Sequence, residues 1–130
     1  MYTSETRSIR VSVKPQYLDS NSEPEKGQYV WGYTILIENR GKEIVQLLTR
    51  FWEITDANGL KQIVHGDGVI GEQPVLGPGE DFEYTSGAPL GTSSGFMSGS
   101  YGMTTDKGEA FDVEIPAFSL DSPHMQRAVH

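Results

Sequence analysis

The stretch YVWGYTILIENRGK, residues 29–42, decides the fold class of this chain. Every second residue at its start is large and apolar, and a β-strand turns alternate side chains to the same face. One face of the predicted strand therefore carries Tyr29, Trp31, Tyr33, Ile35 and Ile37. The polar residues 39–42 then predict a hairpin turn, because Asn and Gly tolerate positive φ. The stretch predicts a long strand with one buried face.

The same alternation continues on both sides of this stretch. It recurs in four further runs, at residues 9–13, 82–84, 97–103 and 111–117. In the last run, Phe111 and Ala117 are expected on the same buried face. Residues 43–55 carry apolar side chains on both faces, which predicts a central or bulged strand. Turn signals separate the runs at intervals of about 8–12 residues, for example at residues 56–59, 78–79 and 106–108.

These features predict an all-β protein, an immunoglobulin/fibronectin-III-like β-sandwich of seven to eight antiparallel strands. Antibody-type domains carry a Cys…Trp…Cys spacing, and this chain has no cysteine, so the fibronectin-III-like variant is favoured. A length of 130 residues fits one domain. We assign residues 1–123 to that domain and predict that residues 124–130 form a disordered tail.

Composition excludes several classes of function. Without cysteine the chain has no disulfide, thiol catalysis or cysteine-ligated metal. Its net charge of −8 would repel a polyanion, which argues against nucleic-acid binding. The apolar runs are far too short to cross a membrane, and residues 1–10 show no secretory signal. We therefore expect a cytoplasmic protein with no membrane partner and no cofactor.

Residues 66–103 are the most distinctive part of the chain. They read GDGVIGEQPVLGPGEDFEYTSGAPLGTSSGFMSGSYGM. This segment resembles the signature of the ApaG family, GxGVxGxxPxLxPGExFxYxSxxxLxTxxGxMxGxYxM, and the resemblance extends over about residues 5–121. It implies a fibronectin-III-like sandwich and an association with cobalt resistance and magnesium efflux. Related domains in eukaryotic F-box proteins and in a polymerase-δ-interacting protein imply that the domain binds other proteins.

The glycine-rich segment 66–71 spells the GxGxxG pattern of dinucleotide-binding folds. In those folds a helix follows the glycines, and its N-terminus binds the pyrophosphate. Here Pro74 and a second glycine-rich turn follow, so the pattern predicts a structural loop. A weak anion site built from backbone N–H groups remains an alternative. The candidate binding residues of this loop are Gly66, Asp67, Gly68 and Gly71.

No catalytic or metal site is predicted. Residues 91–95 spell GxSxG around Ser93, but a nucleophile elbow needs a following helix, and a strand pattern follows instead. The carboxylates Glu80, Asp81 and Glu83 cluster along one edge. Such a cluster more often keeps a sheet edge soluble than binds a cation.

The aromatic residues complete the functional hypothesis. We expect most of Tyr29, Trp31, Tyr33 and Trp52 to lie in the core and at least one to be partly exposed beside the glycine loop. The sequence therefore predicts a non-catalytic protein-interaction module of unnamed partner, acting through this region. A small-molecule, anion or divalent-cation sensor using residues 66–71 is the alternative function, and pairing through a free sheet edge would allow a homodimer.

Overall fold

The computed structural model describes residues 1–123 and contains nine strands and two short 3-10 turns. The strands are β1 (Tyr2–Thr6), β2 (Ile9–Tyr17), β3 (Tyr29–Asn39), β4 (Val45–Asp56), β5 (Lys61–Asp67), β6 (Val75–Leu76), β7 (Asp81–Leu90), β8 (Ser94–Thr105) and β9 (Ala110–Asp121). The 3-10 turns, η1 (Asp19–Asn21) and η2 (Pro24–Lys26), lie in the segment between β2 and β3. In the described part of the chain, no helix is long and apolar enough to cross a bilayer. The tail predicted at residues 124–130 lies outside the described residues.

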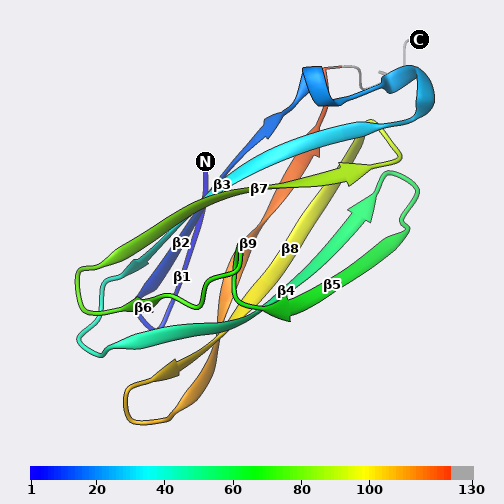
Figure 1. Ribbon diagram of the computed structural model, residues 1–130. Helices are drawn as coiled ribbons and strands as arrows, with labels where there is room; N and C mark the ends of the chain where they lie inside the picture. Colours follow the sequence, from blue (N-terminus) through cyan, green and yellow to red (C-terminus); the bar gives the residue numbers. More distant parts are fainter. Residues whose placement is uncertain (124–130) are drawn as a thin grey trace.

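The strands form two antiparallel sheets packed face to face (Figure 1). One sheet has the order β1-β2-β3-β7, and the other has the order β5-β4-β8-β9 with β6 paired to the start of β4. The prediction of an all-β sandwich is confirmed. The strand count is higher than predicted because the polar strand β1 and the two-residue strand β6 carry no apolar alternation.

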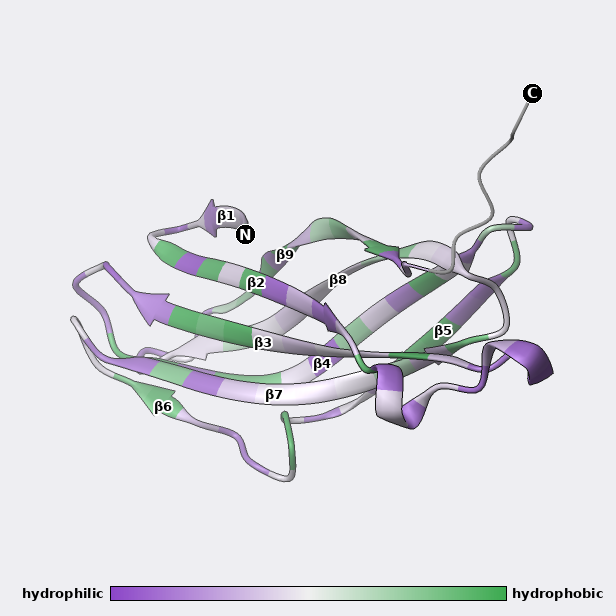
Figure 2. Ribbon diagram, turned by 90° about the horizontal axis from the view of Figure 1, so that it is seen from above, coloured by the Kyte–Doolittle hydropathy of each residue, from purple (hydrophilic) through white to green (hydrophobic). Residues whose placement is uncertain are grey.

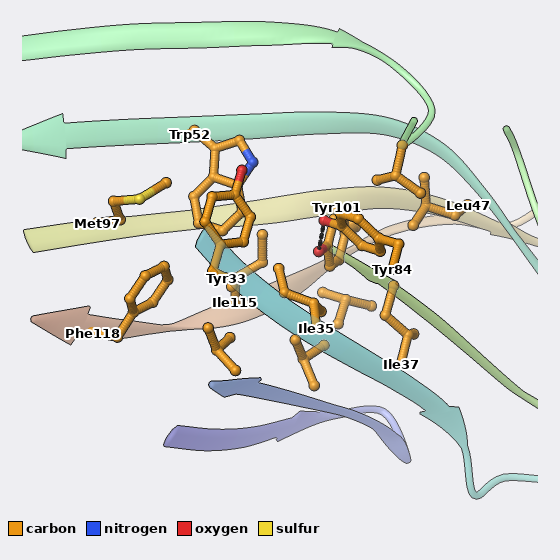
Figure 3. Packing of buried hydrophobic residues seen from close by; sticks show 14 of the residues in the cluster. Tyr33, Ile35, Ile37, Leu47, Trp52, Tyr84, Met97, Tyr101, Ile115 and Phe118 are labelled. Carbon is orange, nitrogen blue, oxygen red and sulfur yellow. Dashed lines mark hydrogen bonds between the residues drawn. The ribbon is translucent and has the colours of Figure 1, made fainter. Parts of the chain in front are cut away.

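The core lies between the two inner faces, as the alternation of residues 29–37 predicts. Hydropathy alternates along β2 in Figure 2, whereas the part of β3 that ends in Ile37 is continuously hydrophobic. In Figure 3, Tyr33 of β3 points toward Trp52 of β4, and their ring centroids are 5.3 Å apart. The Trp52 ring meets Phe118 of β9 edge-on at 6.0 Å. These three rings join the two sheets at the centre of the sandwich.

The hairpin predicted at residues 39–42 is wrong. β3 pairs with β2 and β7, and residues 40–44 carry the chain across to the other sheet. Asn39 is buried, and its side-chain amide donates hydrogen bonds to the carbonyl oxygens of Glu43 and Leu76. The polar residue that suggested a turn instead satisfies backbone groups where the chain changes sheet.

The tight hairpin occurs at Arg7 and Ser8, between β1 and β2. Both residues have positive φ, 48° and 66°. Their strands pair directly on either side, with Thr6 opposite Ile9. Two successive positive φ values are the geometry of the two-residue turns that match the twist of a hairpin. Because positive φ is uncommon for Arg and Ser, the sequence does not predict this turn.

Two β-bulges adjust the registers in the five-stranded sheet. The bulge predicted within residues 43–55 is confirmed, because the pairing of β4 with β8 shifts between Leu47 and Thr49. A second shift, between β8 and β9, places an extra residue of β9 beside Pro116. It reverses the alternation, so Ala117 is exposed and Phe118 is buried. The prediction that Ala117 faces inward is therefore wrong.

The sandwich is closed on one side and open on the other. On the closed side, Ser4 Oγ donates to the Glu114 carbonyl oxygen at 2.9 Å, and the Glu114 N–H donates to Thr6 Oγ1 at 3.2 Å. These bonds join the edge strands β1 and β9, which lie together in Figure 2. On the open side the edge strands are β5 and β7.

Candidate functional site

A pocket of about 350 Å³ lies between the two sheets on the open side. One wall belongs to β3 and β7, and it includes Tyr33, Tyr84, Ser86 and Ala88. The facing wall belongs to β4 and β5, and it includes Arg50, Trp52, Ile54, Gln62 and Val64. Val69, Ile70 and Gly71 of the glycine loop complete the lining. We call this pocket the edge cleft.

The edge cleft exists because small residues occupy inward positions of the edge strands. Ser86 and Ala88 of β7 stand opposite Tyr33 and Trp31 of β3. On the other sheet, Gly66 of β5 stands opposite Arg50 of β4. A large side chain at these positions would fill the space between the sheets. The interior therefore stays incompletely filled where the sandwich is open.

Arg50 is the cation of the edge cleft. Its Nη1 atom donates to the carbonyl oxygens of Asp67 and Gly68, both at 3.0 Å. The guanidinium lies over Gly66, where an added Cβ would be 3.0 Å from Nη1. Within residues 1–123, Arg50 forms no ion pair with a carboxylate. A guanidinium has five N–H donors, so this one retains capacity for an acceptor in the cleft.

Three tyrosine hydroxyls lie deep beside the edge cleft. Tyr84 and Tyr101 share a hydrogen bond of 2.5 Å, drawn as a dashed line in Figure 3. Burial raises the pKa of both hydroxyls further above neutrality than that of an ordinary tyrosine, and both are protonated throughout the neutral range. Burial also raises the pKa of Tyr33, while the neighbouring Ser86 and Arg50 side chains oppose that rise. The deep side of the cleft is thus polar but uncharged.

The glycine loop is a tight turn that borders the edge cleft. Gly66 and Asp67 end β5, and Gly68 and Gly71 have positive φ, 65° and 79°. The N–H of Gly68 donates to the Leu48 carbonyl oxygen at 2.8 Å. Val69 and Glu72 exchange two backbone hydrogen bonds, at 2.8 and 2.9 Å. These internal bonds occupy the N–H groups of Gly68, Val69 and Glu72, which a bound anion would otherwise use.

The predicted aromatic residues separate into two groups. Tyr33 and Trp52 are buried and line the edge cleft beside the glycine loop. Trp31 is 1% exposed and packs against Tyr17 and Tyr29, with centroids 5.3 and 6.4 Å apart, outside the cleft. Of the four candidates only Tyr29 is partly exposed. Most of the four therefore lie in the core, as expected, and the partly exposed Tyr29 is not among the residues that line the cleft.

The remaining motif residues have local structural contacts. The carbonyl oxygen of Ser93 accepts the N–H of Ser122 at 3.0 Å. Glu80 Oε1 accepts the N–H of Gly77 at 2.6 Å, which braces the turn before β7. Asp81 and Glu83 are exposed on β7. Within residues 1–123, no group of three or more His, Asp or Glu side chains is placed to hold a metal ion.

Sequence reasoning missed Arg50 and Ser86 as candidate site residues. Both occupy inward positions of strands whose other inward residues are mainly apolar. A single cation at such a position is a usable signal, because an unpaired charge is rarely placed in a core. The bulge at Leu47–Thr49 hides the signal, since it changes the side to which Arg50 points.

The outer face of the five-stranded sheet carries exposed apolar side chains. Ile63 of β5 is 51% exposed, Phe51 of β4 is 38% exposed and Phe96 of β8 is 47% exposed. Phe51 pairs across the strands with His65, which is also exposed. The neighbouring Glu53 pairs with Ile63. The free edge of β5 therefore has apolar side chains beside it.

Known proteins share the sequence and the fold of this chain. The family model described as the ApaG domain matches residues 19–105. The chain is 65% identical to Protein ApaG of Rhodospirillum centenum over 124 residues, covering 95% of each chain, and 58% identical to Protein ApaG of Parvibaculum lavamentivorans over the full length of both. A crystal structure from Bordetella pertussis, of a protein described under the name ApaA, superposes with a TM-score of 0.88 at 44% identity, covering 93% of this chain and 98% of that one. None of these three names specifies a reaction. The resemblance carried by residues 66–103 is confirmed, and the chain belongs to the ApaG family.

Proposed function

We propose that the chain is a non-catalytic protein-interaction module whose partner adds an extended segment to the free edge of β5. The observation that supports the proposal is the contrast among the four sheet edges. Side-chain hydrogen bonds to β9 cover β1. β7 carries Asp81, Glu83 and Pro89, which discourage strand pairing. Within the described residues β5 has no such cover and no proline, and its charged residues Lys61 and Asp67 lie only at its two ends.

The free edge of β5 offers both hydrogen bonds and apolar contacts. In an antiparallel pair, alternate residues turn their N–H and C=O groups away from the partner strand, so half of those on β5 face outward. A strand added there gains backbone hydrogen bonds, and exposed Ile63 and Phe51 give its side chains an apolar contact. The net charge of −8 favours a partner segment with basic residues, since opposite charge accelerates association.

A sensor acting through the glycine loop receives less support. Its backbone N–H groups at Gly68, Val69 and Glu72 are bonded within the protein. Gly66 makes room for Arg50, and Gly68 for the Glu72 carbonyl oxygen. We assign the loop a supporting role beside Tyr33 and Trp52 of the edge cleft. We further propose a cytoplasmic location and that any link to cobalt resistance or magnesium efflux runs through the protein partner.

A single introduced cysteine tests the proposal, because the chain has none of its own. His65→Cys on β5 and Glu83→Cys on β7 each receive a photoactivatable cross-linker. Both positions are exposed on edge strands. We expect cross-linking in cells to capture the same partner reproducibly from β5 and not from β7.

Two charge substitutions complete the experiment. Ile63→Lys, beside the β5 edge, should abolish that capture, whereas Val75→Lys, at an equally exposed apolar residue on β6, should preserve it. Equal capture from β5 and β7, or capture that survives Ile63→Lys, contradicts the proposal. A cross-linked species made of two copies of this chain would assign the edge to a homodimer instead.

A further inference from the structure

We propose that the edge cleft binds a small organic carboxylate, with the carboxyl group on Arg50 and an apolar body against Trp52. The site goes beyond the protein interaction proposed above, because it uses the inward residues of β5 rather than its outer edge. Its volume of about 350 Å³ is at the small end of the range for ligand pockets, roughly 300–1,000 Å³. It suits a ligand with one ring or a short branched chain.

The lining divides into an apolar part and a charged part. Trp52, Ile54, Val64, Ala88 and Met97 supply the apolar surface. Arg50 lies toward the glycine loop, where its Nη1 atom is fixed by the Asp67 and Gly68 carbonyl oxygens. A ligand with a charge at one end and an apolar body at the other matches this division. A few placed polar groups in a mainly apolar lining are typical of small-molecule sites.

The charge balance favours a carboxylate over a phosphate. Among the residues of the described range 1–123 that line the cleft, Arg50 is the only Lys or Arg. The whole chain has a net charge of −8, which disfavours a dianion at a site with one cation. A carboxylate carries one charge, and a guanidinium can bind its two oxygens through parallel N–H donors. The protonated hydroxyls of Tyr33 and Tyr84 add neutral donors without adding charge.

The cleft has a solvent-exposed rim and a buried floor. Gln62, Ile70 and Pro89 line the cleft and are exposed, so a ligand can enter from solvent. Trp52, Tyr84 and Met97 are buried in the core cluster. Binding would therefore replace water in a preformed space and leave the sheets in place.

Titration of the full chain with benzoate tests the proposal. Isothermal titration calorimetry gives the affinity, and the indole N–H resonances report the location. Trp52 lines the cleft and Trp31 does not, so the Trp31 signal is an internal reference. We expect saturable benzoate binding that shifts the Trp52 signal alone. Benzyl alcohol, which lacks the charge, should bind at least about tenfold more weakly, and inorganic phosphate should bind more weakly than benzoate.

Two variants distinguish the charged and apolar contributions. Arg50→Gln should weaken benzoate binding by about tenfold or more, whereas Arg40→Gln, an equal charge change on a surface arginine paired with Glu5, should leave it unchanged. Ala88→Leu retains Arg50 and fills the cleft, so it should abolish binding while the protein stays folded. If Arg50→Gln does not fold, Ala88→Leu still tests whether benzoate binds in the cleft.

Three results would overturn the proposal. They are no saturable benzoate binding, equal affinity for benzyl alcohol, and tighter binding of inorganic phosphate. Undiminished benzoate binding in folded Ala88→Leu would also place the ligand elsewhere. Because none of these measurements involves the outer edge of β5, failure here leaves the protein-interaction proposal intact.

Discussion

Replacing Gly68 by alanine should destabilise the fold more than the same change at Gly71, three residues later in the same loop. Both glycines have positive φ, 65° and 79°. A residue with a Cβ in that left-handed region costs roughly 1–2 kcal/mol. The two sites differ in their surroundings, because a Cβ at Gly68 would overlap the carbonyl oxygen of Glu72, whereas nothing lies within 4 Å of one at Gly71.

The overlap at Gly68 sets the size of the difference. The Glu72 carbonyl oxygen accepts the N–H of Val69 at 2.8 Å, and it must move away from an added Cβ. Losing that hydrogen bond costs roughly 0.5–1.5 kcal/mol. We therefore expect a loss of about 1.5–3.5 kcal/mol for Gly68→Ala, against about 1–2 kcal/mol for Gly71→Ala.

Urea unfolding followed by tryptophan fluorescence measures both losses. Trp31 and Trp52 are buried, so unfolding changes their environment, and linear extrapolation gives the free energy of unfolding. Gly79→Ala is a control in another turn, with φ of 82° and nothing within 4 Å of an added Cβ. It should match Gly71→Ala. Equal losses at Gly68 and Gly71, or no loss at Gly68, would refute the reasoning.

Three further predictions concern the core. Tyr84→Phe and Tyr101→Phe each leave the other hydroxyl buried without its partner and should cost about 1–3 kcal/mol in urea unfolding, while the double variant should cost less than their sum. Burial raises the pKa of both hydroxyls from 10, so their contribution to stability is complete below pH 10 and declines as pH rises toward the folded-state values. Circular dichroism should therefore show unfolding above pH 10, and the double Phe variant should show less of it. Phe118→Ala should cost about 3–5 kcal/mol, whereas Phe96→Ala, exposed on β8, should change stability by under about 0.5 kcal/mol; similar losses for both would contradict the assigned burial.

The sandwich could be predicted because most strands show an alternating pattern within their own stretch of sequence. Alternation along residues 29–37 identifies the buried face of β3 without any knowledge of its neighbours, and the structure buries Trp31, Tyr33, Ile35 and Ile37 on that face. Turns at Gly59, Gly79 and Gly108 were equally visible, since all three have the positive φ that glycine adopts without strain.

Strand pairing could not be predicted in the same way. Which strand lies beside which depends on contacts between segments far apart in the chain, and neither alternation nor turn residues encode them. Asn39 illustrates the difficulty, because an asparagine two positions before a glycine fits a hairpin turn and a buried crossover equally well. The bulge at Pro116 reverses the expected face of Ala117 for a similar reason, since only the register with β8 reveals the extra residue.

The candidate site depends on strand pairing and register more than the fold class does. Sequence reasoning placed Tyr33, Trp52 and the glycine loop in one region. Tyr33, Trp52 and Gly71 line the cleft, whereas the candidates Gly66, Asp67 and Gly68 do not. Sequence reasoning did not find the cleft itself, which results from Ser86 and Ala88 standing on an edge strand opposite larger residues of β3. In a central strand, neighbours on both sides would cover such small residues. On the open side of a sandwich they leave space, and the inward cation Arg50 gives that space a chemical preference.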